Sequence, residues 1–132
     1  MQKESALSSN TGTIKVGETM SNDMLHNYLT KFGIGIKTGS GLPGESSGIL
    51  RPVSDWSGTT APTVAFGQGY SLTAMQATSV FATIANNGVR VSPTVIAGTS
   101  DPSGHFTPAG NRSTTRVVSE DTAVKLRIMM ES

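Results

Sequence analysis

Two short motifs carry side chains that could take part in acyl transfer. Ser8-Ser9-Asn10 offers hydroxyl and amide groups, and Lys37-Thr38-Gly39 offers a cation beside a hydroxyl. Serine-based acyl transfer needs a nucleophilic serine with a nearby base, a second hydroxyl that relays protons, and a cation for a substrate carboxylate. Each motif alone also has a structural interpretation, because Ser and Asn favour helix caps and a Lys-Thr-Gly turn can simply be solvated.

The nucleophile that this chemistry requires is absent from the 132 residues. An S-x-x-K motif places a serine three residues before a lysine, but that position is held by Gly12, Tyr28, Ile34 or Thr122. There is no G-x-S-x-G turn, and neither histidine of the chain has a convincing triad partner. We interpret both histidines, His26 and His105, as structural or solvated.

Composition excludes several other classes of protein. Ten Lys and Arg balance nine Asp and Glu, so the net charge of +1 gives no electrostatic basis for nucleic-acid binding. No segment approaches the run of about 20 apolar residues that spans a bilayer. The absence of cysteine and the presence of two histidines argue against disulfides and a metal site, and no cofactor is expected. The length suits one ordinary domain.

The first half of the chain predicts two helices and a long irregular segment. Residues 11–20 are weakly helical, with Asn10 as the expected N-cap. Residues 21–32 have one apolar face, a cap at Ser21 and a stop at Gly33. Residues 33–69 contain nine glycines and three prolines, so we expect no helix there, only short strands, for example around residues 48–50.

The second half predicts a well-defined helix over residues 73–86. Thr73 and Gln76 form a capping box, and Asn87-Gly88 supplies the left-handed stop. Apolar residues surround nearly the whole helix, so we expect it to be buried on most sides. We expect a strand within residues 89–96, which Pro93 restricts to the edge of a sheet, and a second short strand at residues 116–118.

Two further expectations concern the segment after residue 98. Residues 99–115 are polar, with turn residues at 101–104, and we interpret the region around His105 as a polar loop. A last helix opens at Ser119 with two acids in its first turn, and we expect it to be still running, without a C-cap, at Ser132.

Longer segments resemble a known family. These are FGIGIKTGSGLPGE at residues 32–45, AFGQGYSLTAMQ at 65–76, ATIANNGVR at 82–90 and SSNTGTIK at 8–15. Together they resemble, in order and over nearly the whole chain, the transpeptidase domain of class B penicillin-binding proteins of the cell-division and elongation types. The resemblance implies an α+β fold related to β-lactamases, of which this chain is a mostly helical part with a long Gly/Pro-rich irregular middle.

The resemblance also implies roles for individual residues. Ser8 would relay a proton between a catalytic lysine and the leaving amine, and Asn10 would hydrogen-bond the substrate's peptide backbone. In the family the catalytic Lys-Thr-Gly lies on a strand well downstream, so we interpret Lys37 as structural. Residues 1–132 would then be a partial transpeptidase domain, running from the S-x-N motif to just before that strand, with no complete second domain.

The implied activity is serine-type D,D-transpeptidation that cross-links peptidoglycan stem peptides. In the full-length protein the expected partners are the D-Ala-D-Ala stem peptide, β-lactams and division or elongation proteins, on the extracytoplasmic face of the cell membrane. The chain alone is expected to be inactive, and it could self-associate. Two alternatives remain: a non-catalytic interaction module of a division or elongation complex, and, less well supported, a serine β-lactamase fragment.

Overall fold

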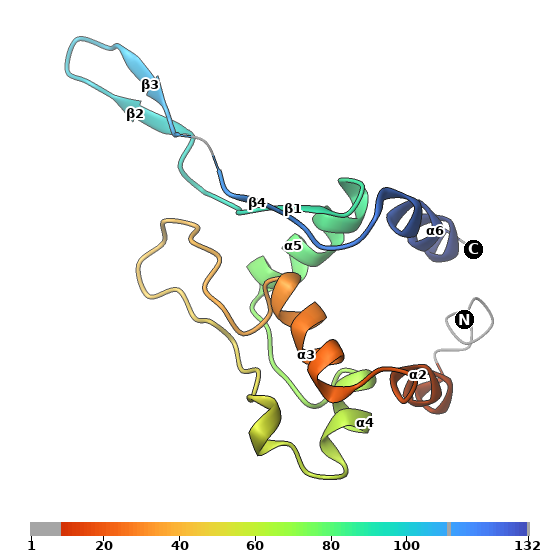
Figure 1. Cartoon of the computed structure of the whole chain (residues 1–132). Helices are drawn as coiled ribbons and strands as arrows, with labels where there is room; N and C mark the ends of the chain where they lie inside the picture. The colour runs from red at the N-terminus through yellow and green to blue at the C-terminus, as the bar shows by residue number, and fades with distance from the viewer. Residues whose placement is uncertain (1–8, 111, 132) are drawn as a thin grey trace.

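The computed structural model describes residues 9–110 and 112–131. Figure 1 shows most of the helices gathered in one body, from which a two-stranded hairpin projects. In chain order the elements are α2 (Asn10–Gly17), α3 (Asn22–Lys31), the 3-10 helix η1 (Val53–Asp55), α4 (Thr60–Ala65), α5 (Ala74–Ala85), β1 (Val89–Val91), β2 (Gly98–Ser100), β3 (Phe106–Pro108), β4 (Thr114–Arg116) and α6 (Glu120–Met130). Helices and short strands are therefore combined, as the α+β prediction states.

Serine caps begin the first two helices. The Ser21 hydroxyl accepts a hydrogen bond from the Met24 amide at 3.2 Å and begins α3, as predicted. The prediction that Asn10 caps α2 is wrong, because the Ser9 hydroxyl accepts from the Gly12 amide at 3.1 Å and Asn10 is the first helical residue. Ser9 holds the extended backbone that a cap requires, so the helix starts one residue earlier than expected.

The middle segment contains two short helices that were not predicted. Both η1 and α4 lie between residues 33 and 69, where the glycines and prolines suggested no helix. Pro62 is the third residue of α4, within the first turn, where a backbone N–H has no acceptor in the helix anyway. The proline therefore removes no helical hydrogen bond, and α4 ends at Ala65 before Gly67, whose φ is +90°.

The ends of α5 follow the prediction, but its burial does not. The Thr73–Gln76 capping box is present. Asn87 and Gly88, which follow the helix, have the left-handed φ values of +51° and +82° that end it. The expectation of burial on most sides is wrong: Phe81 is 59% exposed, and the three buried residues are the polar Gln76, Ser79 and Thr83. Within the described residues β1 and α6 pack on α5, which leaves much of its apolar surface uncovered.

Gln76 joins α5 to the irregular middle of the chain. Its side chain is completely buried, and its Oε1 accepts from the Thr73 amide at 2.8 Å. Its Nε2 donates to three carbonyls of the middle segment, those of Gly33 at 3.2 Å, Ile36 at 2.8 Å and Ser47 at 2.8 Å. One side chain therefore ties the start of α5 to the turn after α3 and to the end of the Gly-rich loop.

Gly48 allows the loop to approach this amide. A Cβ atom on Gly48, whose φ is +68°, would lie 2.4 Å from the Ser71 carbonyl oxygen and 2.9 Å from Gln76 Oε1. The next residue, Ile49, pairs with Ser71 through two backbone hydrogen bonds of 2.9 Å. This isolated bridge is the strand-like contact expected near residues 48–50.

The strands form two separate antiparallel pairs. β1 pairs with β4, with Val89 opposite Arg116, and stops before Pro93, which cannot donate to a ladder. β2 pairs with β3, with Gly98 opposite Pro108, and this is the hairpin that projects in Figure 1. The turn predicted at residues 101–104 is confirmed, and it connects two short strands that were not predicted. The residues of these strands are too polar to indicate a buried sheet.

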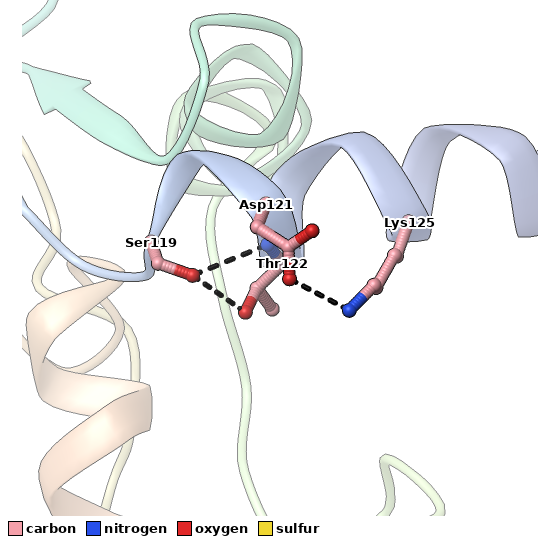
Figure 2. Close-up of polar contacts among 4 residues, drawn as sticks. All are labelled: Ser119, Asp121, Thr122 and Lys125. Atoms are coloured by element: carbon pink, nitrogen blue, oxygen red, sulfur yellow. Dashed lines mark hydrogen bonds and ion pairs between the residues drawn. The ribbon is translucent and has the colours of Figure 1, made fainter.

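α6 begins and ends with hydrogen-bonded caps. Figure 2 shows the Ser119 hydroxyl accepting from the Thr122 amide at 3.2 Å, and Asp121 paired with Lys125 at 2.7 Å one turn later. The expectation of an uncapped helix running to Ser132 is wrong. The helix ends at Met130, and the C-cap Glu131 donates its amide to the Arg127 carbonyl at 3.2 Å.

Arginine side chains connect α6 and β4 to the end of α5. Arg127 Nη1 donates to the Ala85 carbonyl at 2.9 Å and to Asn87 Oδ1 at 2.8 Å, while Arg116 donates to the Asn87 carbonyl at 3.1 Å. Cations are favoured at a helix C-terminus because the carbonyl groups there carry a partial negative charge.

Among the described residues, no helix is long and apolar enough to cross a bilayer.

We predict that Gln76→Ala destabilises the chain by about 3 kcal/mol, because it leaves several buried backbone groups without partners, each costing about 1–3 kcal/mol. Urea unfolding followed by circular dichroism measures this change. The control is Gln68→Ala, since the Gln68 side chain is exposed; its effect should stay below about 0.5 kcal/mol. Equal losses for the two variants would contradict the role assigned to Gln76.

Candidate functional site

The Ser-Ser-Asn motif lies at the start of α2. Ser8, the predicted proton relay, lies outside the described residues. Asn10 occupies the first position of α2, where its side chain is exposed and forms no hydrogen bond with the described residues. Because Ser9 supplies the cap, the side-chain amide of Asn10 takes no part in capping α2.

Close packing on α4 fixes the position of α2. A Cβ atom on Gly17, the last residue of α2, would lie 2.7 Å from Ala65 Cβ at the end of α4. Beside this contact lies a cavity of about 280 Å³, lined by Ile14, Met20, Leu25 and Pro62 among others. The glycine therefore lets the two helices approach closely, which orients the turn that carries Asn10.

The Lys-Thr-Gly turn exposes its lysine and buries its threonine. Lys37 is exposed and has no polar partner among the described residues. Thr38 and Ser40 are buried, at 5% and 1% exposure. Hydroxyl and backbone groups of this turn therefore face the protein, whereas the lysine side chain faces solvent, consistent with a structural interpretation of Lys37.

The Glu45 carboxylate accepts four hydrogen bonds from this turn. Its Oε1 accepts from the Thr38 amide at 2.6 Å and from the Thr38 hydroxyl, and its Oε2 accepts from the amides of Gly39 at 3.1 Å and Ser40 at 3.4 Å. The hydrogen bond from the Thr38 hydroxyl, with those from the three amides, holds the pKa of Glu45 below its ordinary value despite partial desolvation. The carboxylate therefore stays ionised and closes the loop of residues 38–45.

The same turn contacts the segment after β1. The Ser40 carbonyl accepts from the Val95 amide at 3.2 Å and from the Thr94 hydroxyl at 3.3 Å. A cavity of about 330 Å³ lies between the turn and this segment, and its lining includes Thr38, Gly39 and Arg112. Neither Lys37 nor Asn10 lines that cavity, so the structure does not bring these two motif residues together there.

Within the described residues, neither histidine side chain pairs with a serine or a carboxylate. The His26 ring meets the Trp56 ring edge-on, with centroids 6.1 Å apart, and His105 lies exposed after the hairpin turn. In residues 9–110 and 112–131, no group of three His, Cys, Asp or Glu side chains could hold a metal ion. Both histidines thus fit the structural or solvated interpretation made from the sequence.

Sequence reasoning missed two organising residues. Gln76 was recognised only as half of a capping box, which accounts for its oxygen but not for the three carbonyls that its nitrogen binds. Glu45 was noted only as the last residue of the LPGE segment. Nothing in the spacing of the sequence indicates which groups Gln76 and Glu45 bind. The glycine-rich stretches near both residues were the one available indication that backbone comes close to these side chains.

The chain matches the family model described as the penicillin binding protein transpeptidase domain over residues 2–132. It belongs to this family. Penicillin-binding protein PbpB of Mycolicibacterium smegmatis is 42% identical over 125 residues, which is 95% of this chain and 19% of that protein. Stage V sporulation protein D of Bacillus subtilis is 33% identical, again over 95% of this chain and 20% of that protein.

Solved structures of the family share this fold. Penicillin binding protein 3 of Mycobacterium tuberculosis, crystallised with aztreonam, superposes with a TM-score of 0.89 at 43% identity, covering 92% of this chain and 27% of that one. The chain spans about a fifth of the length of the two curated relatives described above. Relatives at 28% identity or more include proteins named peptidoglycan D,D-transpeptidases, among them that of Escherichia coli at 37%.

The environment of Glu45 predicts a pH dependence of stability. Its folded pKa is depressed, so its contribution is complete above the ordinary value of 4.5 and is lost as the pH falls through the folded pKa. We expect the melting temperature of the wild type to exceed that of Glu45→Gln by a constant amount near neutral pH, and this difference to shrink below pH 4.5. Thermal melts of both chains across this range measure it. A difference that grows on acidification would contradict the assignment.

Proposed function

We propose that the protein carrying this chain is a serine-type D,D-transpeptidase that cross-links peptidoglycan stem peptides. The observation that carries the proposal is the family match over residues 2–132, within which the Ser8-Ser9-Asn10 motif is retained. The exposed amide of Asn10 at the start of α2 supports a role in contacting substrate. Relatives named D,D-transpeptidases support the reaction class.

In this proposal each motif residue has one task. The Ser8 hydroxyl passes a proton from a lysine to the leaving amine of the stem peptide, which avoids expelling an unprotonated amide nitrogen. Asn10 donates its side-chain N–H to a carbonyl of the substrate and thereby orients the scissile bond. The acyl-accepting serine and its lysine, the S-x-x-K pair, are not among these 132 residues, so the chain alone is inactive.

The proposed setting follows from the same assignment. Stem peptides ending in D-Ala-D-Ala are the proposed substrates, and β-lactams would acylate the same serine. One relative has been crystallised with aztreonam and with ampicillin, which supports β-lactam binding here. We place the domain on the extracytoplasmic face of the bacterial membrane, anchored by a segment that is not in this chain. No cofactor enters the reaction.

A second candidate function is a non-catalytic module that packs on proteins of a division or elongation complex. The exposed apolar side chains of α5 and α6, Phe81, Ile128 and Met130, favour it, because such surfaces tend to associate. The gene sequence on both sides of this chain separates the two candidates. An S-x-x-K before it and a K-T-G-[ST] after it support the enzyme, and the absence of both supports the module.

Acylation by a fluorescent penicillin tests the enzymatic proposal. A longer protein that carries this chain together with an S-x-x-K segment should form a covalent adduct. Ser8→Ala and Asn10→Ala in that protein should each slow adduct formation, by about 10²-fold or more for the proton relay. The 132-residue chain alone should form no adduct.

Lys37→Ala is the matched control, since it removes a cation from the second motif at an exposed position. Its acylation rate should stay within about twofold of the wild type. A loss for Lys37→Ala as large as that for Ser8→Ala would make Lys37 catalytic. An adduct on the 132-residue chain would overturn the prediction that it is inactive.

A further inference from the structure

Four donors of one turn converge on a single carboxylate. The amides of Thr38, Gly39 and Ser40 and the Thr38 hydroxyl all donate to Glu45. Successive backbone N–H groups that point to one place form a concave anion-binding site. We propose that residues 38–40 are a carboxylate-binding site that the chain's own Glu45 occupies, and that a free small carboxylate binds there when the Glu45 side chain is removed.

The arrangement of donors favours a carboxylate over a spherical anion. Oε1 takes both donors of Thr38, and Oε2 takes the amides of Gly39 and Ser40, so two oxygens in one plane are each bound twice. Chloride would have to occupy a single point between these donor pairs. The site therefore discriminates by shape, as two-oxygen recognition does elsewhere in proteins.

Glu45 forms no ion pair with a cation among the described residues, and Arg112, which lines the neighbouring cavity with Thr38 and Gly39, lies beyond ion-pair distance from it. Among the described residues, the one ion pair within 4.0 Å joins Lys125 and Asp121 in α6, which is far from Glu45 in the sequence. Lys37 adjoins the turn but is exposed and forms no ion pair with the described residues. The negative charge is thus balanced by backbone dipoles and a hydroxyl, which remain in place when the glutamate side chain is removed.

Contacts that do not involve Glu45 hold the turn in shape. The Ser40 carbonyl accepts from Val95 and Thr94, and the Ser40 hydroxyl accepts from the Leu42 amide at 3.4 Å. A Cβ atom on Gly39, whose φ is +74°, would meet nothing within 4 Å, so this side of the turn is open. A ligand could therefore enter from the Gly39 side without displacing other parts of the chain.

Formate rescue of Glu45→Ala tests the proposal, because formate is the smallest carboxylate. The variant, labelled with ¹⁵N, is titrated with sodium formate and, separately, with sodium chloride at equal ionic strength. We expect saturable shifts of the Thr38, Gly39 and Ser40 amide signals with formate alone, and a rise in melting temperature that the wild type does not show. Linear shifts, or shifts equal to those in chloride, would overturn the proposal.

Two further variants complete the experiment. Asp55→Ala removes an exposed carboxylate that accepts from the Ser54 hydroxyl and closes no comparable turn, so formate should not stabilise it beyond the wild type. Glu45→Gln keeps a side chain of the same size in the site, so formate should shift the Thr38, Gly39 and Ser40 amide signals much less than in Glu45→Ala. If neither Glu45 variant folds in chloride, formate must restore the helical circular dichroism signal; failure to do so would refute the site. These readouts do not depend on transpeptidase activity.

Discussion

The hydrogen bonds of the buried Gln76 side chain join three segments that lie far apart in the sequence. Because the capping box commits Oε1 to the Thr73 amide, Nε2 must face the opposite way, where it meets the carbonyls of Gly33, Ile36 and Ser47. Two N–H groups serve three acceptors, so one hydrogen is shared. The start of α5, the turn after α3 and the end of the Gly-rich loop are thereby held together by one buried amide.

Polar anchors of this kind compensate for a small apolar core. The buried hydrophobic residues among those described are Ile34, Val64, Val117 and Ala123, while Gln76, Ser79, Thr83, Thr38 and Ser40 are equally buried. A glycine-rich loop has few side chains to bury, so its position must come from backbone hydrogen bonds. Gln76 fixes one end of the loop and Glu45 closes its centre, while the Lys37 side chain is exposed to solvent.

Local signals in the sequence predicted local structure well. The caps at Ser21, Thr73 and Ser119 and the stop at Asn87 depend on neighbouring residues, and all four were predicted. Contacts between distant segments were not predictable, because no sequence pattern around Gln76 or Glu45 indicates which backbone groups their side chains bind. The same limit applies to burial: an all-round apolar α5 suggested a buried helix, yet the described residues cover only part of it. For the site, the roles predicted for Ser8 and Asn10 came from the family resemblance alone, and the structure adds that Asn10 is exposed.

Hydrogen exchange of the Gln76 side-chain amide tests the central claim most directly. If Nε2 is buried against three carbonyls, its two protons should exchange with solvent many times more slowly than those of the exposed Gln68 side chain, at equal pH and temperature. Both pairs of protons can be followed in one ¹⁵N-edited spectrum after transfer to D₂O. Slow exchange at Gln76 with fast exchange at Gln68 is the predicted result. Exchange of both side chains at the same fast rate would contradict the account.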